Sequence, residues 1–189
     1  MKVYTLIGGV NGVGKSSLTG VLMSSYNDLG TIVNPDNYAA EHGGNNYIAG
    51  KLAVRTIESC IERGVDLTQE TTLSGRQPAA TAKKAKEHGY YIRLFYVCIN
   101  SLDECLGRIR NRVSKGGHDI PAETVGRRYE KRFADLARIL PYCNEVRLFD
   151  NDNGFREAAE YRNGTLLIKT EAVPEWLTAL KEYLSQNLI

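Results

Sequence analysis

A glycine-rich loop near the N-terminus constrains the fold of this chain more than any other feature. Residues Gly9-Val-Asn-Gly-Val-Gly-Lys-Ser16 match the pattern G-x-x-x-x-G-K-[ST], and they follow the apolar, β-branched run 2–8. In a strand-loop-helix context, such a loop turns successive backbone N–H groups toward phosphate. The sequence therefore predicts a nucleotide-binding loop between a buried strand and a helix, formed by Gly9, Asn11, Gly12, Val13, Gly14, Lys15, Ser16 and Ser17.

Two side chains of this loop have a predicted chemical role. Lys15 is expected to reach the β- and γ-phosphates of ATP, and the Ser16 hydroxyl is expected to ligate Mg²⁺. The N-terminus of the following helix adds a partial positive charge that favours anions. ATP and Mg²⁺ are therefore the predicted cofactors.

The rest of the chain alternates between strand-like and helix-like segments. Strand-like runs occupy residues 2–8, 31–34, 65–69, 90–99 and 146–149, and segments with helical apolar spacing separate most of them. This alternation predicts an α/β domain over residues 1–189, with a mainly parallel five-stranded sheet and helices on both faces. Residues 161–168 predict a small hairpin around Asn163-Gly164, and Pro174 begins a last helix.

Composition agrees with one globular domain. The chain has 189 residues, of which 42% are hydrophobic and 24% charged, which argues against disorder and a coiled coil. No stretch approaches the roughly 20 apolar residues of a membrane span. Four widely spaced cysteines form no C-x-x-C pair, so we expect core residues in a reduced cytoplasm.

Positive charge is concentrated in one segment. Residues 108–138 contain nine Lys or Arg and four Asp or Glu, a net charge of +5, whereas the whole chain carries +2. Two predicted helices joined by Gly116-Gly117 would form a lid over about residues 108–130 that closes on triphosphate. Arg112 and Arg128 are predicted to stabilise charge in the transition state, with a solvated basic face as the alternative. Such a solvated face is the favoured interpretation for Arg110, Lys131 and Arg138.

Polar residues follow several predicted strands, where ligands bind in open α/β sheets. Asp36 could accept the proton of an acceptor hydroxyl, or it could simply belong to an Asx turn. Glu70 could orient Mg²⁺-bound water or bind the acceptor together with Thr71 and Thr72, or it could be a helix cap. Asn151 lies in a loop that would border adenine, with a plain turn as the alternative.

The motifs occur in an order that resembles the zeta-toxin family, and more narrowly its compact chromosomal members. They are the phosphate loop, Asn34-Pro-Asp36, Glu70-Thr-Thr-Leu-Ser-Gly75, Arg112-Val-Ser-Lys-Gly-Gly-His-Asp-Ile-Pro121, Arg127-Arg-Tyr129 and Asp150-Asn151. The resemblance implies a P-loop kinase that phosphorylates a sugar hydroxyl of UDP-N-acetylglucosamine, using ATP and Mg²⁺. A small antitoxin protein is the partner that it suggests.

The same resemblance implies roles for individual residues. Asp36 would be the general base, Glu70 would lie near the acceptor, and Arg112 would be a lid arginine. Arg127, Arg128 or His118 would complete the lid site, because the family's second arginine matches none of them cleanly.

The sequence leaves two further functions open. A kinase acting on a nucleic-acid end would use the basic segment, but that segment lacks interleaved aromatic residues for base stacking. A nucleotide-dependent switch without phosphotransferase activity would not need acids such as Asp36 and Glu70 on the acceptor side.

Overall fold

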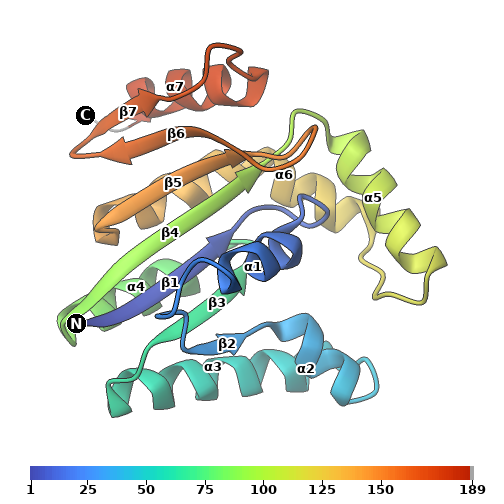
Figure 1. Cartoon of the computed structure of the whole chain (residues 1–189). Helices are drawn as coiled ribbons and strands as arrows, with labels where there is room; N and C mark the ends of the chain where they lie inside the picture. Colours follow the sequence, from blue (N-terminus) through green and yellow to red (C-terminus); the bar gives the residue numbers. More distant parts are fainter. Residues whose placement is uncertain (188–189) are drawn as a thin grey trace.

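A seven-stranded sheet forms the centre of the molecule (Figure 1). The computed structural model describes residues 1–187, and its strands are ordered β2-β3-β1-β4-β5-β6-β7. Five strands pair in parallel, and these confirm the predicted sheet: β1 (Lys2–Gly8), β2 (Thr31–Val33), β3 (Leu67–Thr71), β4 (Tyr90–Cys98) and β5 (Glu145–Asp150). Glu70 and Thr71 lie inside β3 and not after it, since this strand begins and ends two residues later than predicted.

The helices follow the predicted spacing with one addition. They are α1 (Lys15–Met23), α2 (Pro35–Glu41), α3 (Asn46–Arg63), α4 (Gln77–Glu87), α5 (Leu102–Ser114), α6 (Ala122–Ile139) and α7 (Glu175–Asn187), with a 3₁₀ turn at Leu140–Tyr142. The sequence did not predict α2, because the residues at its start, 34–37, are types that are common in turns. The Asn34 side chain caps this helix by accepting a hydrogen bond from the Asp36 N–H at 2.9 Å.

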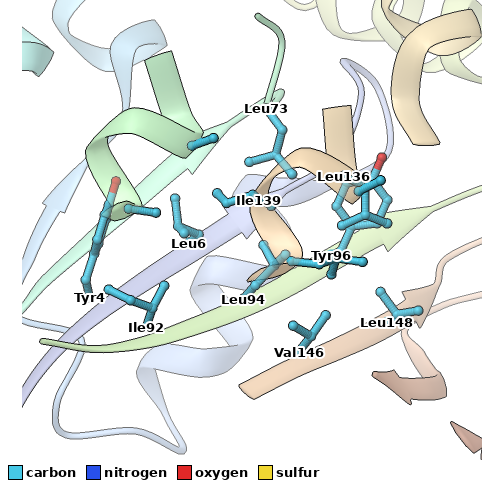
Figure 2. Close-up of a cluster of buried hydrophobic side chains, with 14 of the residues drawn as sticks. Tyr4, Leu6, Leu73, Ile92, Leu94, Tyr96, Leu136, Ile139, Val146 and Leu148 are labelled. Carbon is cyan, nitrogen blue, oxygen red and sulfur yellow. The ribbon is translucent and has the colours of Figure 1, made fainter. Parts of the chain in front are cut away.

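Alternating side chains of the central strands build two core layers. In β4, Ile92, Leu94 and Tyr96 point to one face together with Tyr4 and Leu6 of β1, as Figure 2 shows. Residues of α3, α4, α6 and α7 cover this face, whereas α1 and α5 cover the other. Burial of each large apolar side chain contributes about 1.5–3 kcal/mol to folding stability. The two layers therefore stabilise the sheet that carries the loops of the site.

The C-terminal hairpin continues the central sheet. β6 (Arg156–Arg162) pairs antiparallel with β5, and β7 (Thr165–Ile168) pairs antiparallel with β6. Asn163 and Gly164 have φ values of 50° and 81°, which fit the turn predicted for Asn-Gly. The hairpin begins at Arg156, five residues before the predicted start. Its first strand was missed because it is rich in Glu and Ala, which have a low strand propensity. Leu188, predicted on the inner face of the last helix, lies outside the described residues.

The segment predicted as a lid contains the end of α5, residues 115–121 and the first half of α6. Figure 1 shows α5 beyond the carboxyl ends of the central strands, on the side of the sheet that carries α1. Ile120 and Val125 are buried and anchor the segment in the core. Within residues 1–187, no helix combines the length and hydrophobicity required to cross a bilayer.

Candidate active site

Glycines allow the phosphate loop to lie close to its neighbours. A Cβ atom at Gly12 would lie 2.4 Å from the carbonyl oxygen of Cys105, and one at Gly14 would lie 2.5 Å from Nδ2 of Asn151. Both glycines also have positive φ angles, 86° and 99°. A side chain at either position would therefore displace the loop.

Asn151 connects the loop after β5 to the phosphate loop. Its Nδ2 donates a hydrogen bond of 2.8 Å to the carbonyl oxygen of Val13, and its backbone N–H donates to the carbonyl of Cys98 at 3.0 Å. Arg108 of α5 donates to the Asn151 carbonyl at 2.6 Å. Asn151 therefore forms hydrogen bonds with the phosphate loop, with β4 and with α5. It lies at the place where the sequence predicted a nucleotide contact.

Lys15 is held within the phosphate loop. Its Nζ donates a hydrogen bond of 3.1 Å to the carbonyl oxygen of Val10. Burial lowers the pKa of Lys15 to about 8, although Glu70 and Asp36 act in the opposite direction. The ammonium group is therefore poorly solvated before a ligand arrives, and an anion in the cavity would stabilise its charge.

Glu70 is hydrogen-bonded to the first two turns of α1. Its Oε2 accepts from the Ser16 hydroxyl at 2.7 Å, and its Oε1 accepts from the Thr19 hydroxyl at 2.7 Å. Nδ2 of Asn34 donates to the same Oε2 at 3.0 Å. Both carboxylate oxygens thus lie against the phosphate loop, which supports the metal-side alternative for Glu70 over the acceptor-side alternative.

Asp36 forms an ion pair with the lid segment. Nη1 of Arg112 lies 3.6 Å from Oδ2 of Asp36, and the two side chains are 39% and 45% exposed. Nη2 of Arg112 donates to the carbonyl oxygen of His118 at 2.7 Å. An ion pair this exposed contributes at most about 1 kcal/mol, so it can open when a ligand enters.

Arg128 connects α6 to the phosphate loop. Its Nη1 donates a hydrogen bond of 2.7 Å to Oδ1 of Asn11. Burial, followed by the neighbouring charge of Arg127, lowers the pKa of Arg128. This desolvated guanidinium would gain from contact with phosphate oxygens, which supports Arg128 as the second lid arginine.

One cavity of about 500 Å³ brings most of the predicted residues together. Gly9 and Val13 shape the phosphate loop without lining this cavity. The predicted residues that line it are Asn11, Gly12, Gly14, Lys15, Ser16, Ser17, Asp36, Glu70, Thr71, Thr72, Arg112, Arg128 and Asn151.

His118 and Arg127 do not line this cavity. His118 lines an adjacent cavity of about 300 Å³, which shares Asn11, Asp36 and Arg128 with the first. Arg127 is exposed and lines neither of the two. Successive residues of a helix differ in direction by about 100°, so Arg128 and Arg127 cannot both face the loop.

The sequence did not predict the site contacts of four residues. Thr19 binds Glu70, and its position one turn after Ser16 was the available signal. Asn34 was expected at the end of a strand and as part of the Asn34-Pro-Asp36 motif, with no role of its own, but its amide contacts Glu70. Arg108 was considered only as part of the basic segment. Gln69 lines the cavity, and the Tyr4 hydroxyl donates to its Oε1, a contact between strands that only the sheet register brings about.

Residues 1–154 match the family model described as Zeta toxin. The chain belongs to the zeta toxin family. An uncharacterized protein of Haemophilus influenzae is also related: it is 34% identical in an alignment of 128 positions that covers 64% of this chain and 88% of the relative. The combination of this family with a P-loop places the protein among the P-loop kinases.

Several solved structures share the fold of this zeta toxin family member. A structure from the PezAT chromosomal toxin–antitoxin system of Streptococcus pneumoniae superposes with a TM-score of 0.66 at 16% identity, over 100% of this chain and 86% of that chain. The AvrRxo1-ORF1:-ORF2 structure with ATP gives a TM-score of 0.72 at 16% identity, over 98% of this chain and 64% of that chain.

Proposed function

We propose that this protein transfers the γ-phosphoryl group of ATP to a hydroxyl group of a small molecule, with UDP-N-acetylglucosamine or another sugar nucleotide as acceptor. The observation that carries the proposal is the common cavity of the phosphate loop, Asp36 and Arg112. The structural neighbour solved with ATP supports the choice of nucleotide. The family resemblance supports the choice of acceptor.

In the proposed reaction, the acceptor oxygen attacks the γ-phosphorus, and the bond from this phosphorus to the β–γ bridging oxygen breaks, so that ADP leaves. The proton of the attacking hydroxyl passes to the Asp36 carboxylate. Lys15 and the backbone N–H groups of the loop hold the phosphates in position. Because this chemistry needs mainly positioning and charge stabilisation, the protein forms no covalent bond to the phosphoryl group.

Ser16 and Glu70 suit a magnesium ion. Both offer hard oxygen atoms, and their 2.7 Å contact places a hydroxyl and a carboxylate at the start of α1, beside the expected phosphates. Ser16 would bind the ion directly, and Glu70 would hold one of its water ligands. When bound, Mg²⁺ would neutralise negative charge on the phosphate oxygens.

Arg112 and Arg128 would supply the remaining positive charge. Each contacts a partner at the edge of the cavity, Asp36 for Arg112 and Asn11 for Arg128. On lid closure these guanidinium groups would move to phosphate oxygens, where they offset the charge of the transition state. The release of Arg112 would also free the Asp36 carboxylate for the acceptor hydroxyl.

The test is an ATP turnover assay with Mg²⁺ and a panel of UDP-sugars. We expect ADP release that depends on a UDP-sugar, and a loss of about 10²–10⁴-fold in kcat for Asp36→Asn. Asn37→Ala alters an exposed neighbour on the same helix and serves as the matched control. Equal turnover by wild type and Asp36→Asn would remove Asp36 from the role of base.

One further arm of the panel addresses another acceptor class. Arg110, Arg127 and Lys131 are exposed and basic, so an oligonucleotide with a 5′-hydroxyl end is included. Phosphorylation of this oligonucleotide in place of every UDP-sugar would overturn the proposed acceptor and leave the kinase assignment in place.

A small antitoxin partner forms the last part of the proposal. It is supported by the structural neighbour from a toxin–antitoxin system. Growth arrest on expression of wild type but not of Asp36→Asn, relieved by co-expression of a protein that co-purifies with the chain, is the expected result.

A further inference from the structure

The last helix is connected to the nucleotide side of the cavity, although it lies outside residues 1–154 that match the family model. Trp176 of α7 is buried, and its indole Nε1 donates a hydrogen bond of 2.8 Å to Oδ1 of Asp150. Its backbone N–H donates to Oδ1 of Asn100 at 2.9 Å. Both partners stand at the carboxyl ends of central strands, at the edge of the sheet where the phosphate loop lies.

The contacts continue from these partners to the phosphate loop. Asn100 is held by Asp152, whose Oδ2 accepts from its Nδ2 at 2.6 Å. Asp150 and Asp152 flank Asn151, which lines the cavity and donates to the carbonyl oxygen of Val13. Loop 150–152 is therefore bound by α7 on one side and by the phosphate loop on the other.

The buried carboxylate of Asp150 depends on the hydrogen bond from the indole. This carboxylate is 5% exposed, and its second oxygen lies 3.5 Å from Nη2 of the half-exposed Arg156. A buried carboxylate that loses a donor must find another partner or move toward solvent. Movement of Asp150 would displace Asn151, the next residue, from the phosphate loop.

We infer that Trp176 is a positioning residue for the nucleotide site, acting through Asp150 and Asn151 on the phosphate loop. The inference rests on the proposed function in so far as the ligand is ATP. It predicts that the indole N–H contributes to nucleotide affinity in addition to the packing of α7. A residue with only a packing role would alter stability but not the affinity of the folded protein.

Four variants of the full chain separate these roles. Trp176→Phe keeps an aromatic ring and removes the N–H donor. Asp150→Asn keeps an oxygen that can accept from the indole, whereas Asp150→Ala removes it. Leu184→Ala removes packing from the buried face of the same helix about two turns beyond Trp176, and it serves as the matched control.

The first readout is the dissociation constant of a fluorescent ATP analogue, measured without acceptor. We expect an increase of about tenfold for Trp176→Phe, consistent with part of one charge-assisted hydrogen bond, and a change below about twofold for Leu184→Ala. In turnover assays, Trp176→Phe should raise KM for ATP while kcat at saturating ATP and KM for the acceptor stay near wild type. Asp150→Asn should bind nucleotide more tightly than Asp150→Ala.

The second readout is hydrogen exchange of the nucleotide-free protein. Trp176→Phe should speed exchange at residues 150–152 and 9–15, whereas Leu184→Ala should affect mainly 175–187. Unchanged exchange in the two loops together with an unchanged dissociation constant would overturn the inference. Neither the dissociation constant nor the exchange measurement uses an acceptor, so failure to phosphorylate any UDP-sugar would overturn the proposed acceptor alone.

The wild-type protein provides its own probe, because Trp176 is the only tryptophan of the chain. Titration with ATP should change its emission, and Asn151→Ala should reduce this change at saturating ATP. A tryptophan emission that stays unchanged at saturating ATP would contradict a coupling between α7 and the nucleotide site.

Discussion

The two sides of the cavity differ in how firmly their side chains are held. On the phosphate side, Glu70 and Thr19 are 6% and 5% exposed and bind each other at 2.7 Å. On the lid side, the Arg112–Asp36 pair spans 3.6 Å and is more than a third exposed. Buried hydrogen bonds to a charged group are costly to break, whereas exposed ion pairs are weak. We therefore expect the phosphate side to be preformed and the lid side to rearrange when a ligand enters.

The strongest test of the preformed side is Lys15→Ala. We expect kcat/KM for ATP to fall by about 10³-fold, because the proposed function places the ammonium group on the phosphates throughout the reaction. The melting temperature should not fall, since a lysine whose pKa is lowered by burial opposes folding at neutral pH. Turnover assays and thermal unfolding check this pair of outcomes, and a large loss of stability would contradict it.

On the lid side, Arg128→Ala and Arg127→Ala form a matched pair. We expect about a 100-fold loss of kcat for Arg128→Ala and less than a threefold change for Arg127→Ala, because only Arg128 reaches the cavity. Steady-state kinetics with saturating ATP measure both. Similar losses in the two variants would show that net charge of the helix matters more than the direction of one side chain.

Glu70→Gln tests the metal role of the preformed side. The amide keeps an oxygen for one of the two hydroxyl donors but loses the negative charge, so the Mg²⁺ concentration for half-maximal activity should rise about tenfold. KM for the acceptor should remain unchanged. The opposite pattern, with an unchanged Mg²⁺ requirement and a raised acceptor KM, would return Glu70 to the acceptor side.

The smallest expected effect concerns pH. With its pKa lowered to about 8, Lys15 of the free protein is a cation below that pH and loses its proton as the pH rises through it. ATP affinity should therefore be full near pH 7 and should decline above pH 8, by at most about tenfold per unit. Calorimetric titrations at pH 7 and pH 9 measure the decline. Lys15→Ala should lack it, and an equal decline in both would assign the effect to another group.

Local chemistry was enough to predict the phosphate loop, the parallel strands and the Asn163-Gly164 turn. Each depends on residues close together in the chain: glycines for positive φ, alternating apolar residues for strands, and Asn-Gly for a tight turn. The hydrogen bond from the Asp36 N–H to the Asn34 side chain is equally local, although the helix that Asn34 caps was not predicted.

Contacts between distant segments were decided only by the tertiary structure. The sequence allowed Glu70 on either side of the site, and the register of β3 beside β1 places it against Ser16. Likewise the helical spacing of Arg127 and Arg128 shows that they point in different directions, but not which of the two faces the phosphate loop. A repeating pattern defines the faces of a helix or strand, and only packing against the rest of the chain determines what each face meets.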